Sequence, residues 1–178
     1  AGVKLMKGDV LDPESISKAA KGMEVIYNLA GTSDNLLARS DPFGDRIFEA
    51  NSLGNLHVVQ AGLKVGARRV VSVSSVFILG HNPGKPVDEE HVVNLWRYAG
   101  PYLLSRLQQE LHLLRHAGRG IEVVIVNPGF IVGAKDRGPN FPGQIVLAYL
   151  KRRIPAHPPG GTSWIGVTDV ADGLFNAA

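Results

Sequence analysis

The sequence predicts a doubly wound α/β fold built on a parallel sheet, and two patterns support this prediction. Short segments of apolar, β-branched residues alternate along the chain with longer segments of helical periodicity. The segments at residues 24–29, 68–74 and 121–126 are rich in β-branched and other apolar residues. Parallel strands that helices cover on both faces have this composition, so we expect three buried strands of one sheet.

The first helices follow from capping residues and periodicity. A short strand is expected at residues 3–6. Asp12 and Pro13 then supply an N-cap and a first-turn proline for a helix that ends near Ala20. A longer helical pattern covers residues 42–63, and one stripe of it is formed by Ile47, Asn51, Gly54 and Val58.

The clearest helical pattern covers residues 101–116. Its leucines recur at helical spacing, so we expect a buried row formed by Leu103, Leu107, Leu111 and Leu114. Tyr102 and Arg106 lie off this row, one turn apart on one face of the helix. Glu110 follows Arg106 by another turn, where its carboxylate is expected to hold the guanidinium.

The last part of the sequence is rich in glycine and proline between residues 133 and 161. One helical stretch is expected there, at residues 144–151. Another helix is expected to begin near Val167, with Asp169 as its cap.

Tyr102 and Arg106 are the candidate pair for proton transfer. A phenol that exchanges a proton near neutral pH needs a pKa below its ordinary value of about 10, and a neighbouring cation provides this by favouring the phenolate. The same spacing also suits a solvated edge of any amphipathic helix. A role for the pair in proton transfer therefore requires a bound cofactor. It also requires partner residues from other parts of the chain.

Such residues follow the predicted strands. They are Asp9 and Val10, residues 28–31, Ser74 and Ser75, and residues 127–129. In an open α/β sheet, ligands bind beyond the carboxyl ends of the strands, so we expect these residues to gather around one site. Serines at the end of a strand are also common in turns. For Ser74, a role in the turn and a role in the site are equally supported.

Composition excludes several classes of function. Without cysteine the chain has no disulfide, thiolate metal site or cysteine nucleophile, and its six histidines lack metal-ligand spacing, so no metal is expected. The net charge is only +3 and the basic residues are scattered, so no nucleic-acid partner is expected. No apolar run approaches the roughly 18 residues of a membrane span. We expect a cytoplasmic protein that does not bind membranes.

Taken in order, these motifs resemble the extended short-chain dehydrogenase/reductase superfamily, of the NAD-dependent epimerase/dehydratase type, which has a Rossmann-like fold. The motifs are Gly8-Asp9-Val10, Asn28-Leu-Ala-Gly31, Asn51-x-x-Gly54, Ser74-Ser75 with Gly80, Tyr102-x-x-x-Arg106, Asn127-Pro-Gly129 through Gly133, and Val167-Thr-Asp-Val170. Within the superfamily, residues 71–76 and 138–156 are most similar to dihydroflavonol-reductase-like proteins and hopanoid-associated sugar epimerases.

The resemblance implies a role for each motif. The catalytic residues would be Ser75, Tyr102 and Arg106, with Tyr102 as general acid or base. NAD or NADP would contact Asp9, Val10, Leu29, Ala30, Gly31, Asn51, Val73, Tyr102, Arg106, Asn127, Pro128 and Gly129. The substrate would contact Ser74, Ser75 and Asn127. Asn51 is equally well explained as a core amide whose partners are neighbouring backbone groups.

Two features depart from the family pattern. Arg106 stands where the family has lysine, and a planar guanidinium does not replace an ammonium conservatively. The Gly-rich phosphate loop and the residue that selects NAD or NADP do not occur in this sequence. We therefore expect a fragment that is incomplete at both ends, leaves an exposed edge on an apolar strand and folds marginally. By itself the fragment is expected to bind dinucleotide poorly and to be inactive.

The resemblance divides the chain into a partial dinucleotide-binding domain at residues 1–133, part of a small substrate lobe at 134–166, and a return to the first domain at 167–178. It implies an NAD(P)-dependent oxidoreductase, epimerase or dehydratase that acts at a carbonyl or alcohol carbon of a sugar-like or phenolic small molecule, and it leaves a homodimer open. The alternative is a non-catalytic dinucleotide-binding or sensor protein. A nucleic-acid-binding module has only the sequence pI of 9.3 in its favour.

Overall fold

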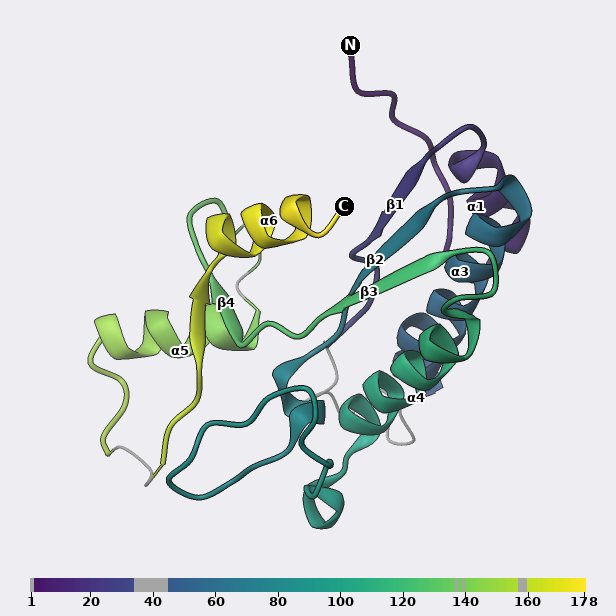
Figure 1. The fold of residues 1–178 in the computed structure, drawn as a ribbon. Coiled ribbons are helices and arrows are strands. Elements are labelled where there is room, and N and C mark those ends of the chain that lie inside the picture. The colour runs from purple at the N-terminus through teal and green to yellow at the C-terminus, as the bar shows by residue number, and fades with distance from the viewer. Residues whose placement is uncertain (1, 34–44, 137, 139, 157–159) are drawn as a thin grey trace.

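Three parallel strands form the main sheet, in the order β1 (Val25–Asn28), β2 (Arg69–Val73) and β3 (Glu122–Val126) (Figure 1). The computed structural model describes residues 2–33, 45–136, 138, 140–156 and 160–178. Val25 pairs with Arg69, which in turn pairs with Glu122, so all three strands point the same way. The predicted α/β class and all three of these strands are confirmed.

Three helices cover one face of this sheet: α1 (Pro13–Ala20), α3 (Gly54–Val65) and α4 (Pro101–His116) (Figure 1). The core between them and the sheet includes Val58, Val59, Val70, Leu113 and Ile121. Helix α1 begins as expected, because the Asp12 carboxylate accepts a hydrogen bond of 3.0 Å from the Glu14 amide.

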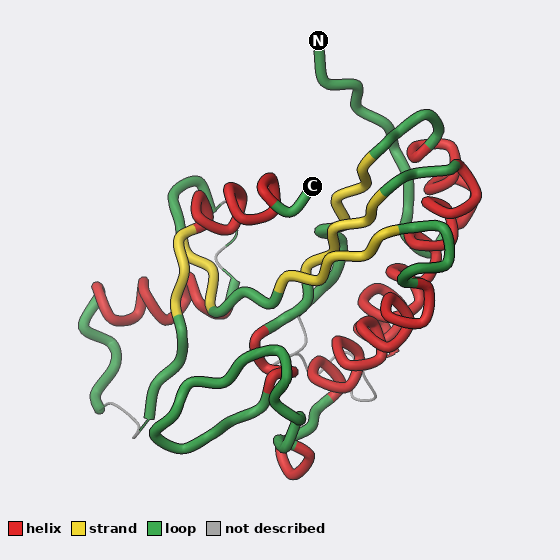
Figure 2. The backbone as a smooth tube through the Cα atoms, viewed as in Figure 1, coloured by secondary structure: helices red, strands yellow, loops and turns green. Residues whose placement is uncertain are grey.

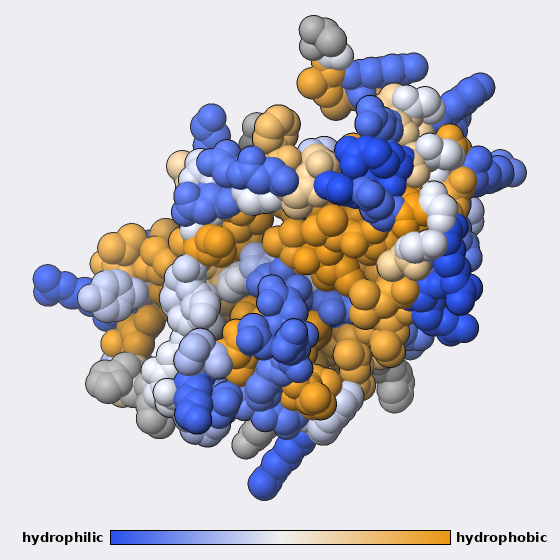
Figure 3. Space-filling view, viewed as in Figure 1, coloured by the Kyte–Doolittle hydropathy of each residue, from blue (hydrophilic) through white to orange (hydrophobic). Residues whose placement is uncertain are grey.

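Helix α6 (Val167–Asn176) packs on the opposite face, where Val170 and Leu174 contact Val71 of β2. The sheet therefore has helices on both sides, but α6 is short. Only β2 is mostly buried, while β1 and β3 are mostly half-buried, so the expectation of three fully buried strands is wrong for the outer two. Figure 3 shows apolar side chains gathered on this face of the molecule, beside α6.

A second, two-stranded sheet lies apart from the first (Figure 2). Its parallel strands are β4 (Phe130–Val132) and β5 (Trp164–Gly166), and α5 (Phe141–Leu150) contacts β4. Helix α5 begins three residues earlier than predicted, because Asn140 caps it by accepting from the Gly143 amide at 3.1 Å. The prediction that Asp169 caps α6 is wrong: Gly166 is the N-cap and Asp169 lies in the first turn.

The predicted strand at residues 3–6 does not form. Val3 and Leu5 are each 91% exposed, and no described strand pairs with this segment. A strand is stabilised by hydrogen bonds to a neighbour, so apolar composition without a neighbour leaves an extended segment in solvent.

The helical pattern at residues 42–63 is confirmed from residue 45 onward; residues 42–44 lie outside the described part of the chain. It consists of α2 (Asp45–Phe48), a π-helical turn over Glu49–Leu53, and α3. The predicted stripe is buried, with exposed fractions of 1% at Ile47 and zero at Asn51. π-helical turns are uncommon and often occur at functional sites, so the position of Asn51 in such a turn suits a residue near a functional site.

Helix α4 has the predicted bounds, but it buries a different face. Leu111 and Leu114 are more than half exposed, whereas Ser105, Arg106 and Gln109 are buried. The helix turns this polar face inward because each of these side chains finds a hydrogen-bond partner there, which removes the main cost of burying it. The predicted leucine row is therefore right for Leu103, which is buried, and wrong for Leu111 and Leu114.

No helix in the described part of the chain is long and apolar enough to cross a membrane. No group of three or more histidine, cysteine, aspartate or glutamate side chains gathers there as metal ligands would.

Candidate active site

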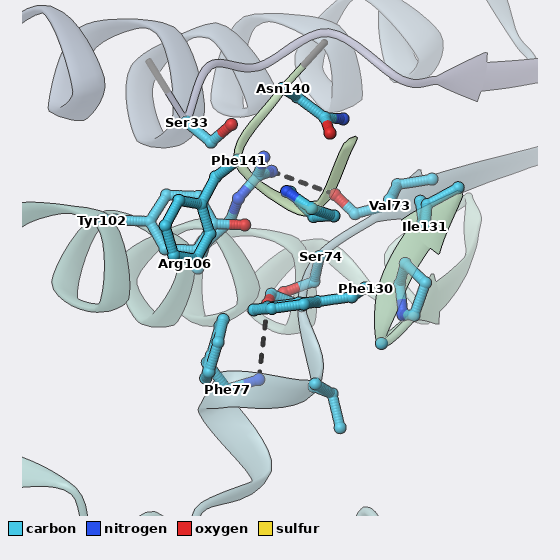
Figure 4. Close-up of a pocket in the computed structure, with 15 residues that line it drawn as sticks. Ser33, Val73, Ser74, Phe77, Tyr102, Arg106, Phe130, Ile131, Asn140 and Phe141 are labelled. Carbon is cyan, nitrogen blue, oxygen red and sulfur yellow. Dashed lines mark hydrogen bonds between the residues drawn. The ribbon is translucent and has the colours of Figure 1, made fainter. Parts of the chain in front are cut away.

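The carboxyl ends of β2 and β3 meet the first turns of α4 around one pocket (Figure 4). The predicted site residues that line it are Val73, Ser74, Ser75, Tyr102, Arg106, Pro128 and Gly129. Residues on the other side of the pocket belong to β4 and to the beginning of α5. The pocket therefore lies between the two sheets.

The two serines differ in how they are used. Ser75 caps a short 3₁₀ helix (Val76–Leu79), and its hydroxyl oxygen accepts a hydrogen bond of 3.4 Å from the Phe77 amide. Its hydroxyl proton remains available as a donor. Ser74 Oγ is buried and has no hydrogen-bond partner among the described residues. Ser75 is thus a turn former as well as a pocket residue, while Ser74 has a hydroxyl that a ligand would satisfy.

Tyr102 lies in the first turn of α4, half-buried at the pocket wall. The Arg106 guanidinium carbon lies 5.3 Å from the centroid of its ring, within cation–π distance. Phe77 meets the same ring edge to face, with centroids 6.5 Å apart. These contacts on its ring restrict the positions that the phenol can take.

Arg106 is only 8% exposed, and its guanidinium bonds inward. Nη1 donates to Gln109 Oε1 at 2.8 Å and to the Val73 carbonyl at 3.2 Å. The expectation that Glu110 would hold this group is wrong, because no ion pair joins the two side chains in the described structure and Gln109 takes that place. Nε is buried and lacks a partner among the described residues.

Asn51 bridges two segments that flank the site. Its Nδ2 donates to the Thr32 carbonyl at 2.9 Å and to Ser105 Oγ at 3.1 Å, and its Oδ1 accepts from the Thr32 amide at 2.7 Å. Ser105 in turn donates to the Tyr102 carbonyl at 2.8 Å. Both polar atoms of the Asn51 amide thus bond to the chain itself, which supports the core-amide interpretation.

A second set of buried bonds continues from Gln109. Its Nε2 donates to Ser72 Oγ at 3.1 Å and to the Val73 carbonyl at 2.9 Å. Ser72 donates to Asn55 Oδ1 at 2.7 Å, and Asn55 Nδ2 donates to the Asn51 carbonyl at 2.7 Å. One network therefore runs beneath the pocket from α4 through β2 to α3.

Sequence reasoning missed four members of this network: Asn55, Ser72, Ser105 and Gln109. A signal was present, because Asn55 follows Asn51 by one helical turn, and Ser105 and Gln109 each follow a predicted site residue by three positions. Polar residues at helical spacing from candidate residues mark a polar helix face.

Asn127 ties the end of β3 to the end of β2. Its Nδ2 donates to Glu110 Oε1 at 2.7 Å and to the Ser75 carbonyl at 3.2 Å. Burial raises the pKa of Glu110, against the smaller lowering effects of the Ser74 hydroxyl, the Asn127 amide and the Arg106 charge. The Ser74 hydroxyl is near enough to act on this pKa but lies outside hydrogen-bonding geometry. Asn127 supports the loop and does not line the pocket itself.

The turn after β1 approaches the site from the side. Asn28 accepts a hydrogen bond of 3.1 Å from the Ala30 amide, and Gly31 lies against the Arg106 guanidinium. Leu29 is 63% exposed. None of the residues at positions 28–31 lines the pocket, so their predicted contacts with the cofactor stay predictions.

Asp9 and Val10 also lie outside this pocket. The Asp9 carboxylate accepts from the Leu11 amide at 2.9 Å and so stabilises its own turn. Val10 packs closely against Gly54 at the start of α3. The predicted contacts of this pair with NAD or NADP therefore stay predictions.

Two features of the site suit a polar ligand such as the nicotinamide half of a dinucleotide. Ser74 Oγ and Arg106 Nε are buried polar atoms without partners in the described structure, and such atoms call for a hydrogen bond from a bound molecule or water.

Comparison with known proteins identifies relatives across nearly the whole chain. The sequence matches the family described as "NAD dependent epimerase/dehydratase family" over residues 1–177. Sterol demethylase protein B of Methylococcus capsulatus is 31% identical over 163 residues, which cover 92% of this chain and 48% of the relative. A putative dihydroflavonol 4-reductase of Synechocystis is 33% identical over 130 residues, covering 72% of this chain and 38% of the relative.

Solved structures agree with this match. The crystal structure of gox2253 superposes with a TM-score of 0.84 at 31% identity, over 96% of this chain and 51% of that protein. A dTDP-glucose 4,6-dehydratase, DesIV from Streptomyces venezuelae, determined with NAD bound, has a TM-score of 0.78 at 22% identity, over 94% of this chain and 52% of that protein, and so supports the fold alone. This chain spans about half the length of these proteins or less.

Proposed function

The chain belongs to the NAD-dependent epimerase/dehydratase family, and on that premise we propose that it carries the proton-transfer site of an NAD(P)-dependent oxidoreductase, epimerase or dehydratase. The substrate is a sugar-like or phenolic small molecule, and the reaction takes place at one of its carbonyl or alcohol carbons. One observation carries the proposal: the pocket brings Tyr102 together with Ser74 and Ser75, with a cation behind the phenol ring.

The chain's own residues divide the work on the substrate oxygen. Tyr102 gives a proton to this oxygen or takes one from it, and the Ser75 hydroxyl donates a hydrogen bond that holds the oxygen in place. Arg106 keeps a positive charge next to the ring, and the bonds to Gln109 and Val73 fix that charge. The nicotinamide, when bound, supplies the hydride chemistry.

We propose that residues 1–133 and 167–178 belong to the dinucleotide-binding domain and residues 134–166 to a small substrate lobe, which the separate β4–β5 sheet supports. A homodimer is supported by the exposed apolar side chains of Leu111 and Leu114 on one helix. A cytoplasmic location is supported by the absence of cysteine.

The test is an assay of nicotinamide absorbance with carbonyl substrates. The chain is assayed alone and again when fused behind a Gly-rich phosphate-binding segment of the family pattern, with NADH or NADPH as cofactor. We expect turnover in the second case, and a loss of about 10²- to 10⁴-fold in Tyr102→Phe, which removes the proton donor. Tyr149→Phe is the matched control, because Tyr149 is 72% exposed and lies outside the pocket.

A non-catalytic dinucleotide sensor is the second candidate, and Arg106 favours it. Both hydrogen bonds described for its Nη1 point into the protein, so that nitrogen does not reach toward a ribose. If the sensor is correct, the fused protein binds NADH without turnover, and Arg106→Lys does not restore activity. Turnover that disappears in Tyr102→Phe would exclude it.

A further inference from the structure

The substrate side of the pocket is walled by a connected row of aromatic rings (Figure 4). Tyr102 meets Phe77 with ring centroids 6.5 Å apart, and Phe77 meets Phe130 at 5.8 Å. Phe130 then meets Phe141 at 5.9 Å with the ring planes at 86°. All four rings line the pocket, and each successive pair is in an edge-to-face arrangement.

These rings come from separate parts of the chain. Phe77 lies in the 3₁₀ helix after β2, Phe130 opens β4, and Phe141 opens α5. Phe130 is the centre of the row, since Trp164 of β5 also packs edge to face against it, with centroids 5.2 Å apart. The ring positions are therefore held by mutual contacts across both sheets, and a flat ring would find a preformed apolar wall.

Five side chains with a hydroxyl or amide group line the described pocket, namely Ser33, Ser74, Ser75, Tyr102 and Asn140, and the Asn140 oxygen already accepts from the Gly143 amide. The hydroxyls of Ser74 and Ser75 follow β2 directly, and the Tyr102 hydroxyl belongs to the ring that ends the aromatic row. A substrate with one oxygen near an apolar ring system matches this arrangement. A molecule with hydroxyl groups all around would leave several of them unpaired against phenylalanine rings.

The charged groups of the pocket also favour an apolar substrate over a diphosphate. Arg106 is the one cationic side chain among the described residues that line the pocket. It is 8% exposed, and its Nη1 already bonds to Gln109 and Val73. A diphosphate is often bound by guanidinium or ammonium groups that are free to pair with it. The described part of the pocket offers no such group.

We propose that the pocket takes a flat, apolar, ring-bearing ketone or alcohol, with its oxygen at Tyr102 and its rings against Phe77, Phe130 and Phe141, in preference to a sugar diphosphate. The reaction of this substrate at its oxygen-bearing carbon rests on the proposed function. The recognition itself needs only the pocket, so binding can be tested separately from turnover.

The test measures binding to the chain by saturation-transfer NMR without cofactor. The probes are 2-acetylnaphthalene as the aromatic ketone, 2-decalone as its saturated fused-ring counterpart, and UDP-glucose as the sugar diphosphate. We expect 2-acetylnaphthalene to bind most tightly and UDP-glucose to be at least about 10-fold weaker, a difference that one or two lost ring contacts account for.

Phe141→Ala tests the wall directly. Phe141 is 37% exposed at the pocket, so its removal should leave the fold intact while binding of 2-acetylnaphthalene weakens about 5- to 10-fold. Phe175→Ala is the matched control, because Phe175 lies on α6, is 75% exposed and does not line the pocket. Circular dichroism of both variants confirms that they are folded.

The outcomes separate the two proposals. Tighter binding of UDP-glucose than of 2-acetylnaphthalene, or unchanged binding in Phe141→Ala, overturns the substrate class whether or not the fused protein turns over. Selective binding of the aromatic ketone that Phe141→Ala weakens supports the substrate class, even where the fused protein shows no turnover and the proposed function fails.

Discussion

Gly31 and Arg106 meet so closely that a side chain at position 31 has no room: a Cβ atom there would lie 2.8 Å from Nη2 of the guanidinium. The same Cβ atom would lie 2.8 Å from Oδ1 of Asn51. Both neighbours are held by hydrogen bonds of their own. The turn after β1 can thus reach α4 and the π-helical turn only because residue 31 is glycine.

Gly31→Ala should therefore destabilise the protein. The new methyl group must displace a bonded guanidinium or a bonded amide, and overpacking of this kind costs about 1–3 kcal/mol. Urea unfolding followed by circular dichroism measures the loss. Gly173→Ala is the control: it lies in α6, where a Cβ atom meets nothing within 4 Å, and should stabilise the helix by about 0.5–1 kcal/mol. Equal stability of the two variants would contradict the close approach.

Gln109→Ala should also destabilise, through the buried network. The change removes the acceptor of Arg106 Nη1 and the donor to Ser72, and leaving buried polar groups unpaired costs about 1–3 kcal/mol. Gln108→Ala provides a matched control, since it is the neighbouring residue on the same helix but is exposed. Comparable free energies of unfolding for the two variants would show that the network contributes nothing measurable.

Glu110 should make stability depend on pH. Its pKa in the folded protein is raised above the ordinary 4.5, chiefly by burial, so between these two values the folded state binds more protons than the unfolded state. The free energy of unfolding contributed by this group therefore falls as the pH rises through that window, and is fully retained below pH 4.5.

Glu110→Gln isolates this effect, because glutamine keeps an oxygen that accepts from Asn127 but cannot ionise. The stability of the original protein relative to the variant should decline as pH rises above about 4.5 and then level off. Other groups that titrate, such as His112, are common to both proteins and cancel in the difference. A difference that increases with pH would reverse the sign and refute the raised pKa.

Gly129→Ala should disturb the pocket lining around residue 129. A Cβ atom there would overlap the backbone carbonyl of Ser163, next to β5, and a backbone group cannot move aside as a side chain can. We expect a loss of stability of about 1–3 kcal/mol, measured by urea unfolding. Gly161→Ala, where a Cβ atom would meet nothing within 4 Å, should be close to neutral. A neutral Gly129→Ala would mean that β5 does not pack this closely against residue 129.

Local patterns predicted the elements well. The three strands of the main sheet lie within the predicted segments, and α4 has the predicted bounds, because apolar composition, prolines and caps act over a few residues. The predicted site residues include seven that line the pocket: Tyr102 and Arg106 on the helix, and Val73, Ser74, Ser75, Pro128 and Gly129 at the strand ends. The strand at residues 3–6 failed because a strand needs a neighbour, which composition does not supply.

The sequence by itself determined the strands, the helix that carries Tyr102, and the residues at the strand ends. Only the tertiary structure decided which face of α4 is buried and which group holds Arg106. Burial of polar side chains depends on partners that are distant in the chain: Asn51 bonds to Ser105 across 54 residues, and Gln109 to Ser72 across 37. A local pattern ranks side chains by their own polarity, whereas the fold buries those whose hydrogen bonds it completes.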